Sequence, residues 1–479
     1  MNAGRSTLPV AIIGGGPVGL AAAARLVTRG LPVKLYEAGA TVAAHVRDWG
    51  HVRLFSPWGF NTDAAATAIL REHGWQAPPA TALPTGGDLY SAYLQPLAEA
   101  APLKSVIETG ARVSNVSRAG IDKVVSRGRG DHPFALSIDT ADGASRVELA
   151  RAVIDASGTW ASPNPAAASG TPAQGEVTFG DRIAYGIPDV LGRDKATYAG
   201  QRVLVIGGGH SAANVLLDLA RLAEMDARTK ILWAVRAGNL ARVFGGGAAD
   251  KLAARGALGD DLKRLVESGK LELALSFAVE RIEQRGDGLT VSDQSGRTLG
   301  PVTRIVVCTG QRPDLAMTRE LRLDLDPWLE SARTLGPMID PNLHSCGSVP
   351  PHGFRELAHP EAGYFAVGIK SYGRAPTFLM ATGYEQVRSV VAHLAGDEAA
   401  ANDVRLVLPE TGVCSTNIKA EIAANGGCCG GPALADADAC CVDDAKAKAS
   451  GATGCGCGAT ETKPVTVVAA SCCGSTRNA

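Results

Sequence analysis

The feature that most constrains the fold of this chain is a glycine pattern that follows an apolar segment near its start. Residues 8–13 are apolar and rich in β-branched side chains, as in a buried strand, and the Ala/Leu-rich residues 21–27 favour a helix. Between them, Gly14, Gly16 and Gly19 have the GxGxxG spacing. Gly14 would permit a tight turn, Gly16 would let the backbone approach a pyrophosphate, and Gly19 would let helix and strand pack closely. The pattern predicts a strand, a turn and a helix that bind a dinucleotide.

An acidic residue at the end of the next apolar segment supports this prediction. Residues 33–37 have the pattern of a second strand, and the last of them, Glu37, lies 18 residues beyond Gly19. At this place a carboxylate accepts hydrogen bonds from a ribose 2′-hydroxyl. The alternative is a structural glycine-rich turn without a ligand, and the helix and the acid at this spacing argue against it.

The same pattern occurs a second time. Residues 201–206 read as a strand, a GxGxxA fingerprint follows at residues 207–212, and a helical stretch comes next. After the following strand, Arg236 stands where Glu37 stands in the first unit. An arginine there can pair with a 2′-phosphate, so the second nucleotide is expected to be NADPH rather than NADH. A solvated arginine at a strand end is the alternative.

The order of segments predicts how the two units are arranged. Strands that end in small-residue turns are expected at 151–158 and 303–310, β-meanders within 106–147 and 271–300, and helices at 86–100 and 379–394. The chain is therefore expected to be an α/β protein with two Rossmann-like dinucleotide-binding domains, the second inserted into the first. The expected boundaries are 1–165 and 313–396 for the first domain, 176–312 for the second and 397–479 for a tail, with a Pro/Ala-rich linker at 162–175.

Composition excludes several classes of function. The net charge is −1, from 47 basic and 48 acidic residues, so there is no electrostatic case for binding nucleic acid or an anionic membrane. No apolar run approaches the roughly 18 residues of a membrane helix, and the start of the chain lacks the pattern of a secretory signal. A cytoplasmic location is expected, and nothing in the sequence predicts an oligomeric state.

The eleven cysteines are concentrated near the end of the chain. None precedes Cys308, and nine lie at or beyond Cys414. Residues 401–479 contain no aromatic residue, so this tail is expected to be largely disordered without a ligand. Close pairs of thiolates favour soft ions such as trivalent arsenic or antimony, and the absence of a CxxC spacing argues against a zinc module. The alternative is a redox-passive tail. The predicted thiol ligands are Cys428, Cys429, Cys440, Cys441, Cys455, Cys457, Cys472 and Cys473, with Cys346 beside His344 or His352 as a further candidate.

The two fingerprints, the small-residue turns and the order of the segments resemble the two-dinucleotide-domain flavoprotein monooxygenases over residues 8–395. More narrowly, residues 52–58, 207–212 and 370–377, followed by a tail with cysteine pairs, resemble the flavin monooxygenases of arsenic-resistance operons. Many relatives carry an F-x-G-x-x-x-H signature before the second fingerprint. This chain has no histidine in the corresponding residues 185–190, which argues against ketone- and amine-oxidising relatives.

The resemblance implies FAD in the first domain and NADPH in the second, with O2 as co-substrate. Reduced flavin would form a 4a-hydroperoxide whose distal oxygen passes to a soft nucleophile, while the protein excludes water. Trp49 could contact the cofactor or simply pack in a surface loop. The expected cofactor-binding residues are Gly14, Gly16, Pro17, Gly19, Glu37, Trp49, Val113, Gly158, Gly207, Gly209, Ser211, Ala212, Arg236, Gly310 and Thr377.

The candidates for contact with the reacting oxygen are Arg53, Lys370, Tyr372 and Arg374, each of which could equally be a structural group or an FAD contact. Cys308 lies inside an apolar strand and is most simply a core residue. Because no cysteine occurs in the first 307 residues, a disulfide reductase with its cysteine pair beside the flavin is not expected.

Three functions remain open on the sequence. The leading hypothesis is an FAD- and NADPH-dependent monooxygenase that oxidises arsenite, methylarsenite or antimonite to pentavalent forms, which would serve arsenic resistance. The second is a monooxygenase of an organic amine or sulfide whose tail guards the enzyme against metals. The third is a metal-buffering or sensing flavoprotein, and the intact fingerprints in both domains weigh against it.

Overall fold

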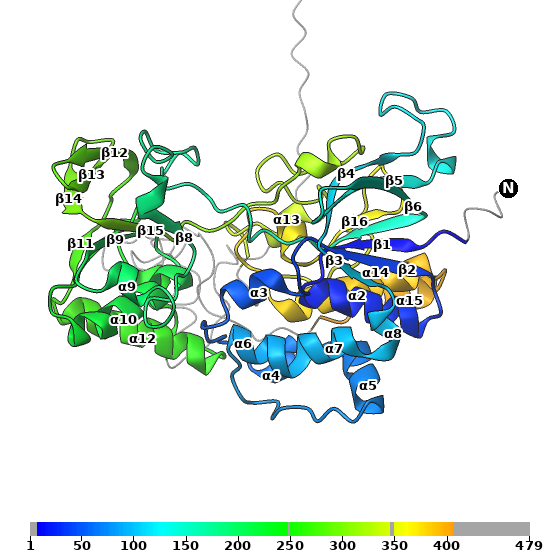
Figure 1. Ribbon diagram of the computed structural model, residues 1–479, viewed down its shortest axis with the longest axis horizontal. Helices are drawn as coiled ribbons and strands as arrows, with labels where there is room; N and C mark the ends of the chain where they lie inside the picture. Colours follow the sequence, from blue (N-terminus) through cyan, green and yellow to red (C-terminus); the bar gives the residue numbers. More distant parts are fainter. Residues whose placement is uncertain (1–6, 248–249, 345–348, 407–479) are drawn as a thin grey trace, which may run out of the picture. The chain divides into compact units, whose positions relative to one another are not determined.

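The computed structural model describes residues 7–247, 250–344 and 349–406 (Figure 1). Two parallel five-stranded sheets organise this part of the chain. The first has the order β16-β7-β1-β2-β3, and the second has the order β11-β10-β9-β15-β8. Their strands are β1 (Val10–Ile13), β2 (Val33–Glu37), β3 (Ile107–Thr109), β7 (Ala152–Asp155) and β16 (Tyr364–Ala366) in the first sheet, and β8 (Ile183–Tyr185), β9 (Arg202–Ile206), β10 (Lys230–Ala234), β11 (Glu272–Ala274) and β15 (Arg304–Val307) in the second.

Each parallel sheet lies between a layer of helices and a three-stranded antiparallel sheet. In β1, Val10 and Ile12 pack in one core with the helices, whereas Ala11 and Ile13 pack in another with the antiparallel strands. Such strands are buried on both faces, which explains their continuous apolar sequences. The antiparallel strands are β4 (Ala111–Arg118), β5 (Phe134–Thr140) and β6 (Ser145–Ala150) in the first domain, and β12 (Val279–Arg285), β13 (Gly288–Asp293) and β14 (Thr298–Val302) in the second.

The helices that pack on the first sheet include α2 (Pro17–Thr28) and α14 (Met380–Leu394), which also contact each other (Figure 1). In the second domain, α10 (His210–Met225) and α12 (Ala253–Glu267) form the corresponding layer. The remaining α-helices are α3 (Ala44–Asp48), α4 (Trp58–Asn61), α5 (Ala64–Glu72), α6 (Gly86–Leu89), α7 (Gln95–Glu99), α8 (Ala101–Lys104), α9 (Lys195–Tyr198), α11 (Ala241–Phe244), α13 (Gly336–Ile339) and α15 (Glu398–Asn402). A π-helical turn, η1 (Tyr90–Leu94), joins α6 to α7, and 3-10 turns occur at η2 (Arg129–Asp131), η3 (Gly180–Arg182), η5 (Ala316–Thr318) and η6 (Gly368–Tyr372).

The described residues differ from the sequence expectations at two places. Residues 162–175, expected to be a linker, bury Ala166, Ala167 and Ala173 in a core of the second domain. The core leaves room for small side chains at these positions, so the segment is buried although it lacks the long apolar side chains that would have predicted burial. The expected tail begins at residue 397, yet α15 follows and buries Ala401, whose carbonyl accepts a 2.7 Å hydrogen bond from Ser389 Oγ. Ordered packing therefore continues beyond that boundary.

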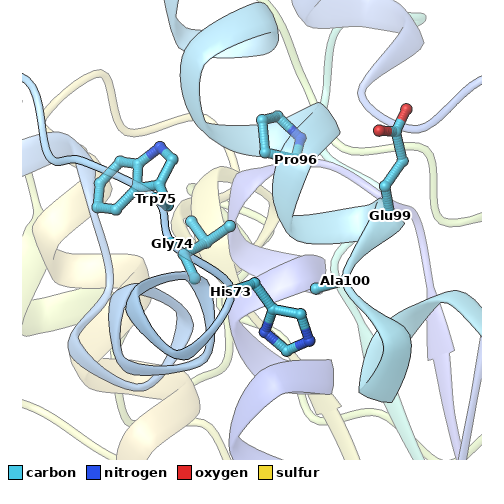
Figure 2. A pocket seen from close by; sticks show the side chains of 7 residues that line it. His73, Gly74, Trp75, Pro96, Glu99 and Ala100 are labelled. Atoms are coloured by element: carbon cyan, nitrogen blue, oxygen red, sulfur yellow. The ribbon is translucent and has the colours of Figure 1, made fainter.

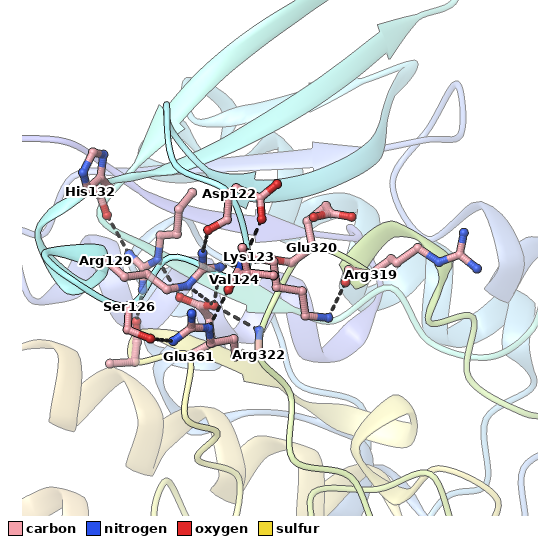
Figure 3. Close-up of polar contacts among 12 residues, drawn as sticks. Asp122, Lys123, Val124, Ser126, Arg129, His132, Arg319, Glu320, Arg322 and Glu361 are labelled. Carbon is pink, nitrogen blue, oxygen red and sulfur yellow. Dashed lines mark hydrogen bonds and ion pairs between the residues drawn. The ribbon is translucent and has the colours of Figure 1, made fainter.

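One buried carboxylate joins the antiparallel sheet of the first domain to two later loops (Figure 3). Glu361 accepts hydrogen bonds from Arg118 Nε at 2.7 Å, from Arg129 Nη2 at 2.8 Å and from the Arg322 backbone N–H at 3.0 Å. All three charged side chains of Glu361, Arg118 and Arg129 are buried. Burial alone would raise the pKa of Glu361, but the hydrogen bonds from the two guanidinium groups outweigh it and lower this pKa.

Within the described ranges, no helix is both long enough and apolar enough to cross a membrane.

Candidate functional site

Each of the three glycines in the first fingerprint is a glycine for a different structural reason. Gly14 has a φ of +96°, and a Cβ there would lie 2.7 Å from the carbonyl oxygen of Ala156. A Cβ on Gly19 would lie 1.9 Å from the Gly14 carbonyl oxygen, so helix α2 packs directly on the turn. A Cβ on Gly16 would meet nothing within 4 Å. The backbone therefore faces open space at the one glycine where a pyrophosphate is expected to approach.

The start of α2 offers hydrogen-bond donors to that space. Gly16 is the N-cap residue and provides no side-chain cap, and Pro17 occupies the first helical position. The first N–H groups of a helix have no partner within it, and the helix dipole favours an anion at this end. A dinucleotide pyrophosphate fits this arrangement.

Glu37 lies beside the fingerprint at the end of β2. One of its oxygens accepts a hydrogen bond from the Gly15 N–H and the other from the Gly39 N–H, each at 2.7 Å. The side chain is 8% exposed. Because each carboxylate oxygen has two acceptor positions, Glu37 retains capacity for the hydroxyls of a ribose. Its backbone partners hold it in place for that contact.

The second fingerprint repeats this geometry. Gly207 has a φ of +133°, and a Cβ there would lie 2.3 Å from the Cys308 carbonyl oxygen, while a Cβ on Gly209 would meet nothing within 4 Å. Gly209 is the N-cap of α10 and gives no side-chain cap. Ala212 is fully buried in the first turn of α10, and Ser211 beside it is partly exposed. This second helix N-terminus also fits a pyrophosphate.

Arg236 lies just beyond β10 and is exposed to solvent. Its Nη1 donates one hydrogen bond to the Ala168 carbonyl at 3.3 Å. A guanidinium has five N–H donors, so this contact orients the side chain and leaves donors for a phosphate.

A half-buried histidine begins α10, and the sequence patterns gave no role to it. The pKa of His210 is lowered to about 4, first by burial and then by the nearby Arg255 charge. Its ring lies 5.4 Å from that of Phe55, and Arg255 forms a buried ion pair with Asp250 at 2.7 Å. His210 is therefore neutral at physiological pH, and the Arg255 guanidinium near it is paired with Asp250.

Lys370, one of the expected catalytic residues, lies buried at the carboxyl edge of the first sheet. Its Nζ is 2.7 Å from Asp155 Oδ2 and donates to Ser157 Oγ at 3.0 Å. Burial alone would raise the pKa of Asp155, but the Lys370 ammonium outweighs it and holds this pKa below its usual value. The sequence indicated both segments but gave no sign that these two residues pair.

The other three catalytic candidates lie in different surroundings. Arg53 is exposed and donates to the Leu83 carbonyl at 2.8 Å. Arg374 forms a half-exposed ion pair with Glu330 at 3.4 Å. Tyr372 is fully buried, and its ring lies 5.7 Å from that of His352. Arg53 and Arg374 therefore bind partners that differ from the Asp155 partner of Lys370.

Two buried threonine hydroxyls lie at the start of α14. Thr377 precedes the helix and Thr382 is in its first turn, and both are almost completely buried. Neither hydroxyl has a hydrogen-bond partner among the described residues. Because buried polar atoms are normally paired, these orphaned hydroxyls fit a bound polar group and support the expectation for Thr377.

The remaining expected cofactor contacts are backbone turns and packed side chains. Gly158 and Gly310 have φ values of +73° and +93°, as expected for turns that follow β7 and β15. Val113 is buried in the antiparallel sheet. The Trp49 ring packs so closely on Gly86 that a Cβ there would lie 2.5 Å from it. Trp49 therefore has at least the packing role that the sequence left open.

Cys308 is a buried core thiol, as the sequence predicted. It donates to the Gly186 carbonyl at 3.2 Å, and burial raises the pKa of its thiol to about 12. Cys346 and all eight paired cysteines of the tail lie outside the described residues. Within the described ranges, no cluster of three or more His, Cys, Asp or Glu side chains could hold a metal ion.

A surface pocket is formed by α5, α7 and the residues after α5 (Figure 2). Its two polar side chains, His73 and Glu99, are both engaged in local hydrogen bonds. His73 is hydrogen-bonded to the Ile69 carbonyl at 2.9 Å, and Glu99 accepts from Gln95 Nε2 at 2.8 Å. Both polar side chains thus have local partners. The pocket is lined by Leu70, His73, Gly74, Trp75, Pro96, Glu99 and Ala100.

Comparisons with known proteins agree with this fold. The family model described as pyridine nucleotide-disulphide oxidoreductase matches residues 11–335. No curated protein matches the chain.

Solved structures of several oxidoreductases have the same fold. Bacillithiol disulfide reductase from Bacillus cereus is 18% identical, with a TM-score of 0.59 over 81% of this chain and 99% of that one. The FAD-bound cadaverine monooxygenase DfoA from Erwinia amylovora is 14% identical, with a TM-score of 0.57 over 84% and 98%. A flavin-containing monooxygenase from Stenotrophomonas maltophilia is 22% identical, with a TM-score of 0.51 over 81% and 99%. The predicted α/β fold with two dinucleotide-binding units is confirmed.

Proposed function

Because the chain belongs to the pyridine nucleotide-disulphide oxidoreductase family, it is an oxidoreductase with an FAD/NAD(P)-binding fold, and we propose that it is an FAD- and NADPH-dependent monooxygenase of trivalent arsenicals or antimonite. FAD occupies the first fingerprint and NADPH the second. FAD supplies the step that no side chain offers, since it accepts two electrons from NADPH and passes them to O2.

The observation that carries the choice of monooxygenase over disulfide reductase is the position of the cysteines. No cysteine occurs in the first 307 residues. Cys308 is buried, and its raised thiol pKa keeps it protonated and unreactive. The described residues therefore contain no cysteine pair that could take electrons at the first site, which favours O2 as the acceptor.

The chain's own residues bind and orient the nucleotides. The free N–H groups that follow Gly16 and Gly209 hold the two pyrophosphates, and Glu37 accepts hydrogen bonds from the ribose of FAD. Thr377 and Thr382 offer hydroxyls to the bound flavin. Arg53, Tyr372 and Arg374 remain candidates for contact with substrate and oxygen.

The choice of substrate is supported by the cysteine pairs of the tail. Adjacent thiolates bind soft trivalent arsenic and antimony, and the lone pair of these species accepts an oxygen atom. The reaction balances as arsenite, O2, NADPH and a proton giving arsenate, NADP⁺ and water. One oxygen atom of O2 enters the arsenate and the other leaves as water.

The test is NADPH consumption in air by the FAD-loaded protein, with arsenite, methylarsenite or antimonite supplied in turn and the oxidation state followed in the same sample. We expect consumption that rises with the substrate and matches the pentavalent product. Turnover of an organic amine or sulfide with no pentavalent product from any of the three would reject the proposal in favour of the organic monooxygenase.

NADPH selectivity gives a separate prediction at Arg236. Arg236→Ala removes the group proposed to pair with the 2′-phosphate, so the KM for NADPH should rise about 10- to 100-fold, the effect of one lost charge-assisted hydrogen bond. The KM for NADH should stay unchanged. Arg228→Ala, which removes an exposed arginine of the same domain, is the control. An equal rise for both nucleotides, or none, would show that Arg236 is a solvated strand-end residue.

A further inference from the structure

The neighbouring parallel strands β7 and β16 of the first sheet bring the buried side chains of Asp155 and Lys370 together. Asp155 is the last residue of β7, and Lys370 lies in η6, which follows β16. Strands β7 and β16 pair in parallel, so their carboxyl ends lie at the same edge. The side chains of Lys370 and Asp155 are 1% and 0% exposed.

Ser157 completes a closed set of hydrogen bonds with this pair. Its hydroxyl accepts from Lys370 Nζ at 3.0 Å and donates to Asp155 Oδ1 at 2.6 Å, and its backbone N–H donates to the same oxygen at 3.1 Å. Tyr364 donates to Asp155 Oδ2 at 2.8 Å. The carboxylate thus accepts four contacts, and Ser157 is fixed by both charged residues.

The turn that contains Ser157 lies directly against the first fingerprint. The hypothetical Cβ of Gly14 would be 2.7 Å from the Ala156 carbonyl oxygen and 2.9 Å from Ser157 Cα. The next residue, Gly158, has a φ of +73°. A small displacement of Ser157 would therefore press on the Gly14 turn, which positions the pyrophosphate and the start of α2.

The turn that carries Lys370 is held from its other side by α14. Gln386 accepts from the Gly368 N–H at 2.8 Å and donates to Ser371 Oγ at 2.9 Å. Gln386 Nε2 also lies 3.1 Å from His352 Nε2. Burial lowers the pKa of His352, and its Nδ1 donates to the Pro350 carbonyl at 2.9 Å, so Nε2 accepts from Gln386. The turn is consequently anchored by α14 on both sides of Lys370, and Lys370 itself is held by its ammonium.

We propose that Lys370 is a positioning residue of the flavin site: paired with Asp155, it acts through Ser157 to fix the turn that supports the FAD fingerprint. A buried ammonium is retained when it is paired, and removal of one partner leaves the other charge uncompensated. Lys370 therefore does not donate to substrate or oxygen. This inference rests on FAD binding in the first site and is independent of the substrate.

The test is FAD affinity and the visible spectrum of bound flavin in Lys370→Met, Asp155→Asn and the double variant. Each single variant should bind FAD at least tenfold more weakly, with an altered flavin spectrum and midpoint potential. The double variant leaves no buried charge, so it should recover most of the affinity. Lys34→Met removes an exposed lysine of the same sheet and is the control, with unchanged affinity and spectrum.

Ser157→Ala keeps the ion pair and removes only the bridging hydroxyl. We expect FAD affinity to fall several-fold and the flavin spectrum to change, with a Tm close to that of the wild type. If Lys370→Met does not fold, the Ser157→Ala variant still tests whether Lys370 acts on the flavin site through Ser157. The proposal is overturned if Ser157→Ala leaves affinity and spectrum unchanged, or if the Lys370→Met variant retains both and loses only product formation, since Lys370 would then act directly.

Discussion

Gly16→Val should leave the protein folded and reduce its affinity for FAD at least a hundredfold. The side chain enters open space, because a Cβ at this position meets nothing within 4 Å, and the φ of −76° suits any residue. The valine would occupy the volume in which the backbone approaches the pyrophosphate. The measurements are flavin content after loading with FAD, and thermal unfolding of the protein without cofactor.

The second fingerprint supplies the matched control for this experiment. Gly209→Val places the same side chain in equally open space at the start of α10. It should retain FAD and lose reduction of the flavin by NADPH. If Gly16→Val kept its FAD, or if both variants lost the same nucleotide, the assignment of the two fingerprints to two cofactors would be wrong.

Glu361→Gln should lower the free energy of unfolding by about 3–5 kcal/mol, the largest stability effect that we expect from one isosteric change. The substitution leaves the buried guanidinium groups of Arg118 and Arg129 without their shared anion. These residues join the antiparallel sheet to the loops at residues 322 and 361 (Figure 3). The measurement is denaturant-induced unfolding of the FAD-loaded protein, monitored by tryptophan fluorescence.

The pH dependence of this effect follows from the lowered pKa of Glu361. Stability from a carboxyl with a lowered pKa in the folded protein is present above the unfolded pKa, about 4.5, and is lost as the pH falls through the folded value. The difference between wild type and Glu361→Gln should therefore be constant near neutrality and shrink below about pH 4.5. Glu224→Gln, which breaks an exposed ion pair with Lys270, should cost about 1 kcal/mol or less. An equal loss in both variants would contradict the argument.

The parts of the fold that could be predicted are those whose cause is local in sequence. The spacing of both fingerprints follows from a turn, an open backbone approach and a helix that begins within a few residues of its strand. The close contacts of Gly14 with Ala156 and of Gly207 with Cys308 join distant segments, and the spacing alone does not show them. The burial of Cys308 likewise follows from the apolar strand β15 that directly precedes it. The alternation of apolar segments, glycine turns and helical stretches predicts the strands, the helices and their order along the chain. It therefore indicated both parallel sheets.

The parts that could not be predicted depend on contacts between distant segments. Asp155 and Lys370 meet because β16 returns beside β7, and neither local pattern shows that pairing. Arg118, Arg129 and Glu361 converge in the same way. The packing of residues 162–175 was missed because Pro and Ala are read as linker residues, whereas here the small side chains are buried.

The measurement that tests the central claim most directly is the stoichiometry of one sealed reaction containing the FAD-loaded protein, NADPH, a limiting amount of O2 and methylarsenite. Our account predicts that one NADPH and one O2 are consumed for each pentavalent arsenical formed, with little hydrogen peroxide. It also predicts that turnover stops when O2 is exhausted. Continued NADPH oxidation without O2 when a low-molecular-weight disulfide is added, with no pentavalent product at any stage, would contradict the account and identify a disulfide reductase.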